Sequence, residues 1–314
     1  MPSNARPVDF IYVGGPRCGS TWLSAVLADH PKVFVPPSKE IHFFNDRMPY
    51  DFEYRYPRGM DFYRSFFTAA APGQQVGDIS PFYFLDPNAA HRIVGHLPDI
   101  RIVAMLRDPV DMLYSLYLLL RRREKRAATF EEELALRPQL IDLCRYDRLL
   151  APYFDLLPGE RLLVMLNEDI RLEPERSVRE IYSFLGVDET FSPPSLSDEF
   201  NVATDEIASW RARSRGYAIR ALNKPMLREV KNVLVKRGMK DITHYGRQDK
   251  ARRSRYEGPL DSTRRWLADW LRDDLRRLAE RLGRDLSIWP TYALAGVDGR
   301  SSAEAAKGRV SSIP

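Results

Sequence analysis

The sequence predicts an α/β fold in which helices flank a doubly wound parallel sheet within a single domain. Three short apolar runs, at 9–14, 101–106 and 161–166, read as buried strands, and helical patterns lie between and after them. Strands that alternate with helices usually pair in parallel through right-handed crossovers. Because ligands of such sheets bind at the carboxyl ends of the strands, a site is expected just after these runs.

The helices are predicted from apolar periodicity and from residues that mark helix ends. One helix is expected over 20–29, and another helical stretch at about 88–96 precedes the second strand. Pro109 suits the first position of the following helix, and Gly186 suits the C-cap of an amphipathic helix over 174–185. A final helix is expected from about 261 to 282, where Gly283 ends it.

The single domain is expected to extend over residues 1–292. Within it, the stretch 193–258 is polar, basic and interrupted, which predicts an irregular region on the substrate side with a mobile loop near 245–256. Residues 293–314 are rich in Ala, Gly, Ser and Lys and are predicted to form a disordered tail.

The composition limits the class of protein. A hydrophobic content of 44% is ample for a core, and no apolar run reaches the length of an integral membrane segment. The N-terminus lacks an apolar signal core, so a cytoplasmic protein is expected. The two cysteines, Cys18 and Cys144, and five scattered histidines argue against a disulfide scaffold and a metal site. The net charge of +5 suits an anionic small molecule better than a nucleic acid, for which no reading motif is present.

The segment after the first strand has nearly the spacing of a phosphate-binding P-loop. Residues 13–23 read VGGPRCGSTWL, with four residues between Gly14 and Gly19 and two hydroxyls directly after Gly19. Glycines allow successive backbone N–H groups to point at an anion. Ser20 stands where a nucleotide kinase carries its lysine, and Arg17 is the nearest cation. The sequence therefore predicts a P-loop-like cradle for a phosphate-like group, but not ordinary ATP chemistry.

A second segment combines an arginine and a hydroxyl at the next strand end. Arg107 directly follows the strand at 101–106, and Ser115 lies about two turns into the following helix. Such a pair could bracket a second phosphate, because a guanidinium forks onto phosphate oxygens. Taken alone, the arginine could equally form a surface ion pair.

Together, the two segments resemble the paired donor-binding motifs of the PAPS-dependent sulfotransferases, where PAPS is 3′-phosphoadenylyl sulfate. The resemblance covers roughly residues 9–187 and recurs faintly at 282–289. It implies that the loop at 16–23 grips the 5′-phosphosulfate, with Arg17 where the family commonly has lysine, and that Arg107 and Ser115 grip the 3′-phosphate. The implied donor contacts are Arg17, Cys18, Gly19, Ser20, Thr21, Trp22, Arg107 and Ser115, with Trp22 as the candidate for the adenine face.

The catalytic group is also implied by resemblance. Residues 37–45, PSKEIHFFN, are similar to a Lys-Glu-x-His-Phe-Phe stretch of the heparan-sulfate type of sulfotransferase and its bacterial relatives. The match implies that Glu40 is the catalytic base and that His42 contacts substrate or a proton network. His42 is the alternative base, since the cytosolic aryl branch uses a histidine. In the structural alternative, Glu40 only pairs with Lys39 or Arg47 and His42 is a packed ring.

Three positions depart from the family pattern or match it weakly. Ile79 stands where heparan-type enzymes carry a lysine, which argues against a heparan-like polysaccharide acceptor. Asn167 replaces a tyrosine beside the adenine and could hydrogen-bond the base but not stack on it. The basic stretch 250–255 is a candidate for the third donor-binding element of the family.

The predicted activity is in-line transfer of a sulfuryl group from PAPS, with PAP as product, to a small-molecule or glycan acceptor. Glu40 would take the proton of a hydroxyl or amine on a carbohydrate, lipid or secondary metabolite, while Arg17 and the loop amides hold the sulfuryl oxygens. No metal is expected to be required. The alternatives are a P-loop kinase or NTPase, a non-catalytic PAP- or nucleotide-binding protein, and a nucleic-acid binder.

Overall fold

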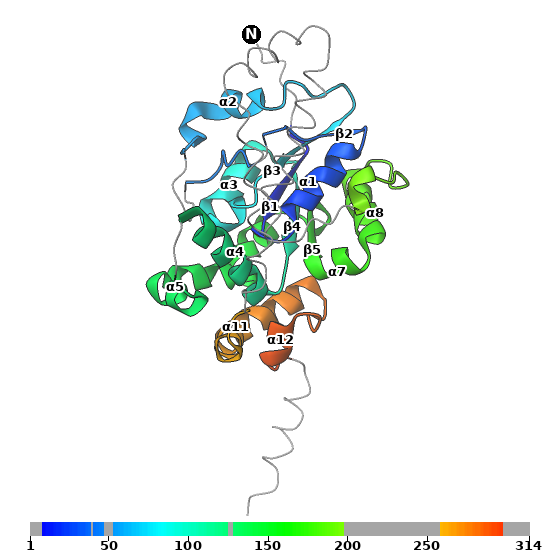
Figure 1. The fold of residues 1–314 in the computed structure, drawn as a ribbon. Helices are drawn as coiled ribbons and strands as arrows, with labels where there is room; N and C mark the ends of the chain where they lie inside the picture. Colours follow the sequence, from blue (N-terminus) through cyan, green and yellow to red (C-terminus); the bar gives the residue numbers. More distant parts are fainter. Residues whose placement is uncertain (1–7, 39, 47–52, 125–127, 198–257, 298–314) are drawn as a thin grey trace, which may run out of the picture. The chain divides into compact units, whose positions relative to one another are not determined.

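A computed structural model describes residues 8–38, 40–46, 53–124, 128–197 and 258–297 of the chain. The residues up to 198 and those from 259 onward belong to one compact unit (Figure 1). Residues 199–258 make up a separate unit, of which only Gly258 is described. Most of the predicted irregular region, the loop at 245–256 and the basic stretch 250–255 therefore lie outside the described residues.

The sheet has five parallel strands in the described residues: β1 (Phe10–Gly14), β2 (Val33–Phe34), β3 (Gln75–Ile79), β4 (Arg101–Leu106) and β5 (Leu162–Leu166). Their spatial order is β2-β3-β1-β4-β5. In the central register, Ile11 of β1 faces Asp78 of β3 on one side and Ile102 of β4 on the other. Strands β2 and β3 lie on one side of β1, and β4 and β5 lie on the other. The predicted doubly wound parallel sheet is therefore confirmed, with its switch point between β1 and β4.

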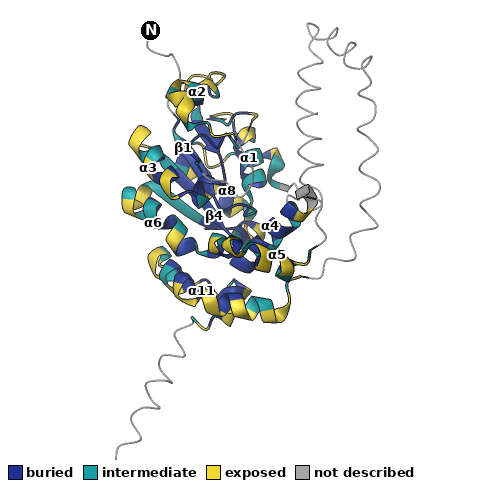
Figure 2. Cartoon of the chain, turned by 90° about the vertical axis from the view of Figure 1, so that its left-hand side faces the viewer, coloured by how far each residue is buried: buried dark blue, intermediate teal, exposed yellow. Residues whose placement is uncertain are grey.

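Helices cover both faces of the sheet, with α1 and α8 on one side and α3 and α4 on the other (Figure 1). Their buried surfaces face the sheet and their exposed surfaces point outward (Figure 2). The α-helices are α1 (Ser20–Asp29), α2 (Gly59–Ser65), α3 (Pro87–His96), α4 (Pro109–Glu124), α5 (Phe130–Leu136), α6 (Tyr146–Leu156), α7 (Asn167–Leu172), α8 (Pro174–Leu185), α11 (Asp261–Leu282) and α12 (Pro290–Leu294). Short 3₁₀ turns cover Tyr56–Arg58, Tyr83–Leu85, Pro138–Cys144, Gly159–Arg161 and Pro194–Ser197. No described helix is both long and apolar enough to cross a membrane.

The predicted helix ends are confirmed at Gly186 and Gly283, which occupy left-handed C-cap positions after α8 and α11. The predicted tail begins later than expected. Helix α12 continues to Leu294 and Ala295 is fully buried, so residues 293–297 belong to the folded unit. The remainder of the predicted tail, 298–314, lies outside the described residues.

Polar contacts join helix α11 to α6. The carboxylate of Asp274 accepts hydrogen bonds from the backbone N–H groups of Asp147 at 3.0 Å and Arg148 at 3.3 Å, at the start of α6. Arg277 donates in return to the Asp147 carboxylate at 2.9 Å. A side chain of α11 thus satisfies amides at the N-terminus of α6 that the helix itself cannot pair.

Candidate functional site

The loop between β1 and α1 is shaped by two glycines with positive φ angles, Gly14 at 146° and Gly19 at 109°. A Cβ on Gly14 would lie 2.4 Å from Phe84 Cβ, and one on Gly19 would lie 3.0 Å from Asn167 Nδ2. A side chain at either position would therefore collide with its surroundings as well as strain the backbone. The glycines allow the chain to leave the sheet and enter α1 within five residues.

The N-terminus of α1 has the features of an anion site. Gly19 provides no side-chain cap, and the first turn carries no acidic residue. Ser20 and Thr21, the first two residues of α1, are only partly buried. The first-turn N–H groups and the positive end of the helix dipole favour a bound anion at this point.

Arg17 and Ser115, which come from the two predicted donor motifs, are in direct contact. Arg17 Nε donates a hydrogen bond to Ser115 Oγ at 3.1 Å. Ser115 lies on α4, which follows β4, whereas Arg17 lies in the loop that follows β1. The sheet therefore brings both motifs to one edge, at the switch point between these adjacent strands.

Arg107 adds positive charge to the same edge. Its carbonyl accepts a hydrogen bond from Tyr146 at 3.0 Å, and its charge acts on both Cys18 and Arg171. Partial burial, and then the charge of Arg107, lowers the pKa of Arg171. Arg171 was not predicted as a site residue. In the sequence, only its position as a cation shortly after the third predicted strand could have pointed to it.

Three residues of the predicted or suspected donor site face inward. Cys18 is fully buried, its thiol donates to the Pro16 carbonyl, and burial raises its pKa to about 12, so any ligand contact would come from its backbone. Trp22 is 5% exposed, which leaves little ring surface for an adenine. Asn167 donates from Nδ2 to the Cys18 carbonyl at 3.1 Å and thereby holds the loop between β1 and α1.

Asp108, next to Arg107, fixes the start of α4. Its Oδ1 accepts hydrogen bonds from the backbone N–H groups of Val110 at 3.0 Å and Asp111 at 3.1 Å, as a helix N-cap does. Arg264 Nη1 reaches the same oxygen at 3.1 Å, and the Thr291 N–H reaches Oδ2 at 2.8 Å. Residues from the C-terminal helices thus support the helix that carries Ser115.

Glu40 and His42 lie at the neighbouring strand end. The Glu40 N–H donates to the Ile79 carbonyl, at the end of β3, at 2.8 Å. Glu40 Oε2 is 3.7 Å from His42 Nε2, and the side chains are 38% and 10% exposed. Tyr12 lies between this pair and the loop that joins β1 to α1: its hydroxyl donates to the Gly15 carbonyl, and the charge of Glu40 adds to the rise that burial causes in the pKa of Tyr12. Lys39 and Arg47, the alternative partners of Glu40, lie outside the described residues.

Three non-glycine residues in the described part of the chain have positive φ angles: Arg17 at 62°, Glu40 at 66° and His42 at 52°. These are the three residues predicted to be catalytic. Such angles are unfavourable for residues with a Cβ, and they persist where the surrounding structure imposes them, often at functional sites.

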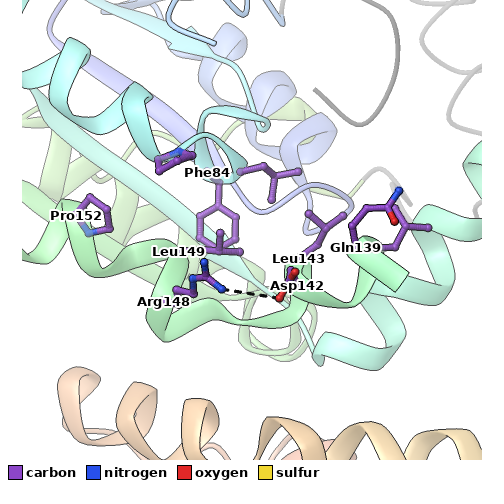
Figure 3. A pocket seen from close by; sticks show the side chains of 10 residues that line it. Phe84, Gln139, Asp142, Leu143, Arg148, Leu149 and Pro152 are labelled. Atoms are coloured by element: carbon purple, nitrogen blue, oxygen red, sulfur yellow. Dashed lines mark ion pairs between the residues drawn. The ribbon is translucent and has the colours of Figure 1, made fainter. Parts of the chain in front are cut away.

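A cavity of about 490 Å³ lies between α6 and the segments 84–87 and 139–143 (Figure 3). Leu143, Leu149 and Pro152 line it together with Phe84, while the Arg148–Asp142 ion pair lies at 3.9 Å among its polar groups. None of the predicted site residues lines this cavity. The cavity is therefore not lined by the residues that mark the edge of the sheet, Arg17, Ser115 and Glu40.

Comparisons with known proteins agree with this geometry. Residues 7–198 match the family model described as the sulfotransferase domain. The crystal structure of a sulfotransferase from Alicyclobacillus acidocaldarius is 31% identical, covers 67% of this chain and 92% of its own, and superposes with a TM-score of 0.55. A membrane-associated sulfotransferase of Dictyostelium discoideum is 31% identical over 128 residues, which are 37% of this chain and 26% of that protein. The human bifunctional heparan sulfate N-deacetylase/N-sulfotransferase 3 is 29% identical over 201 residues, which are 57% of this chain and 22% of that protein. The chain thus spans about a quarter of the length of these curated relatives.

Proposed function

This chain belongs to the sulfotransferase family, and from that premise we propose that it transfers a sulfuryl group from PAPS to a hydroxyl or amine, with Glu40 as base. The acceptor class that we propose is a carbohydrate, a lipid or a secondary metabolite. The observation that carries the proposal is the contact between Arg17 and Ser115, because it joins the two motifs assigned to opposite ends of the donor.

The chemistry of the site fits such a donor. The uncapped N-terminus of α1, with Ser20 and Thr21, suits the phosphosulfate group, and Arg17 adds a permanent cation there. Arg107 and Ser115 suit the 3′-phosphate. Ser115 accepts from Arg17 through a lone pair, so its own proton can be donated to a phosphate oxygen.

PAPS supplies a sulfuryl group attached to a phosphate oxygen, and displacement at sulfur releases PAP. Glu40 accepts the proton that the acceptor hydroxyl or amine loses as its bond to sulfur forms, a contribution of about 10²–10⁴-fold. Arg17 and the first-turn amides of α1 stabilise the negative charge that develops on the departing phosphate. His42, beside Glu40, either orients the carboxylate or replaces it as base.

The acceptor of the heparan-sulfate relatives is not carried over to this chain. At the end of β3, Ile79 is 1% exposed and provides no cation for an anionic polysaccharide. The proposal therefore includes an acceptor that is less charged than heparan sulfate.

Calorimetry with PAP and AMP tests the donor assignment. We expect PAP to bind at least about 10-fold more tightly than AMP, because only PAP carries the 3′-phosphate. Equal affinities would contradict the assignment of Arg107 and Ser115. A panel of acceptors with labelled PAPS, read by mass spectrometry for an added sulfate, then tests transfer. PAP binding without transfer or PAPS breakdown would favour a non-catalytic nucleotide-binding protein, and ATP hydrolysis would favour the kinase or NTPase.

A further inference from the structure

A fully buried carboxylate lies directly behind the segment that carries Glu40. Asp78 is on β3, and its side chain is 0% exposed. In the described structure it accepts three hydroxyl hydrogen bonds: Ser80 Oγ donates to Oδ1 at 2.6 Å, and Tyr83 and Tyr63 donate to Oδ2 at 2.8 and 3.1 Å. Burial raises the pKa of Asp78, and the three hydroxyls oppose that rise. Since all three partners donate, Asp78 acts as an acceptor toward every one of them.

Two of these hydroxyls also accept hydrogen bonds from the main chain beside Glu40. The N–H of His42 donates to Ser80 Oγ at 3.2 Å, and the N–H of Phe43 donates to the Tyr83 hydroxyl at 3.0 Å. A hydroxyl has one proton, so a hydroxyl that gives it to Asp78 presents lone pairs to the amide. Asp78 therefore determines the direction in which both hydroxyls point.

The main chain held in this way adopts an unfavourable conformation. Glu40 and His42 both have positive φ angles, which a residue with a Cβ keeps only where neighbouring contacts impose them. Besides the two relayed bonds, the segment is held by the bond from the Glu40 N–H to the Ile79 carbonyl and by Arg55, which donates to the Ile41 carbonyl at 3.0 Å. Loss of a relayed bond would allow the main chain at 42 and 43 to relax and the carboxylate of Glu40 to change its direction.

We propose that Asp78 is a positioning residue for sulfuryl transfer, which acts through Ser80 and Tyr83 to fix the main chain at 42 and 43 and the direction of the Glu40 side chain. This inference rests on the proposed function, because it takes Glu40 as the base. Asp78 itself does not contact the reacting atoms.

Tyr83→Phe and Tyr63→Phe form a matched pair that tests the relay. Each variant removes one buried phenol hydroxyl from the same carboxylate oxygen of Asp78 and leaves the aromatic ring in the core. Only the Tyr83 hydroxyl also holds a backbone amide of the segment, whereas Tyr63 reaches Phe43 through ring stacking that the variant keeps. The two variants should therefore be destabilised to a similar extent, which thermal unfolding measures.

The first readout is amide hydrogen exchange, which needs no acceptor. We expect Tyr83→Phe to accelerate exchange at Phe43 by about 10-fold or more and Tyr63→Phe to leave it nearly unchanged. The second readout is kcat for PAP release from PAPS, with an acceptor from the panel or with water. Here we expect about a 10-fold loss in Tyr83→Phe alone, because small displacements of a catalytic group are costly, while the Kd for PAP stays within about 2-fold in both variants.

Equal exchange at Phe43 in the two variants, or equal loss of kcat, would overturn the inference. Asp78→Asn is the second test, since an amide nitrogen in place of Oδ1 reverses the Ser80 hydroxyl, whereas one in place of Oδ2 reverses the hydroxyls of both Tyr63 and Tyr83. We expect faster exchange at His42 or at Phe43, according to which oxygen is replaced, and about a 10-fold loss of kcat; unchanged exchange at both amides and unchanged kcat in a folded Asp78→Asn protein would contradict the proposal. Failure of the proposed function looks different, because the wild-type protein would then release no PAP from PAPS, whether or not it binds PAP.

Discussion

Arg17 donates a hydrogen bond to Ser115 across 98 residues of sequence, at 3.1 Å. The contact crosses the switch point of the sheet, from the loop after β1 to the helix after β4. A single ligand with two anionic groups can therefore touch both motifs. A P-loop that binds ATP would not need the second motif.

Ser115→Ala should weaken PAP binding by about 10-fold, or about 1.4 kcal/mol, because it removes a hydroxyl from a charge-assisted network. AMP, which has no 3′-phosphate, should bind as it does to the wild type. Calorimetry with both nucleotides checks this, with Ser183→Ala on the exposed surface of α8 as the control. An equal loss for PAP and AMP would show that Ser115 acts through Arg17 or the fold and not on the 3′-phosphate.

Glu40→Gln should lower PAPS turnover by about 10²-fold or more, because the amide has the same shape but cannot accept the proton. The Kd for PAP should stay close to that of the wild type, since Glu40 is not assigned to the donor. Turnover with the panel acceptor and calorimetry are the two measurements. Nearly normal turnover would transfer the role of base to His42, which His42→Asn then tests.

Gly77→Ala and Gly95→Ala should change stability in opposite directions. A Cβ on Gly77 would lie 2.0 Å from Phe10 Cζ on the adjacent strand, so overpacking should lower the free energy of unfolding by about 1–3 kcal/mol. Gly95 is exposed in α3, and no atom lies within 4 Å of the added carbon. Alanine there should therefore raise the free energy of unfolding by about 0.5–1 kcal/mol. Urea unfolding of the two variants measures both changes, and a shared sign would contradict the packing of β1 on β3.

Asp274 should make stability depend on pH. Burial raises its pKa above 3.8, so its contribution to stability is fully present below pH 3.8 and is lost as the pH rises through the pKa of the folded state. Asp274→Asn cannot titrate. The free energy of unfolding of the variant, measured in urea between pH 3.5 and 7, should therefore increase relative to that of the wild type as the pH rises. A difference that does not change with pH would contradict the raised pKa.

Strands β1, β4 and β5 could be predicted because they are uninterrupted apolar runs, and the sulfotransferase family was correctly inferred from the motifs that follow the first two. Strand β3 could not, because it carries Gly77 and Asp78, which are unfavourable in strands. Tertiary contacts explain both residues: the ring of Phe10 occupies the space above Gly77, and three hydroxyls surround Asp78. Strand propensity therefore fails to predict β3, because Gly77 is required for packing against Phe10 and Asp78 for the proposed relay.

The candidate site could be predicted only in part for a similar reason. Arg17, Ser115, Glu40 and His42 lie in short motifs, and the structure brings the first two together and the last two together. Their roles toward a donor and an acceptor remain predictions. Arg264 and Thr291 contact Asp108 from distant parts of the chain, and no local sequence pattern predicts such contacts.

The bonds to Asp108 also set an order of events during protein synthesis. Arg264 and Thr291 lie 156 and 183 residues beyond Asp108. The ribosome releases the N-terminal strands first, so the buried Asp108 carboxylate lacks these partners until Thr291 has emerged. The edge of the sheet that carries Arg107 and Ser115 is consequently completed only after Thr291 has been synthesised, and a nascent chain that stops after β5 lacks these supports for the start of α4.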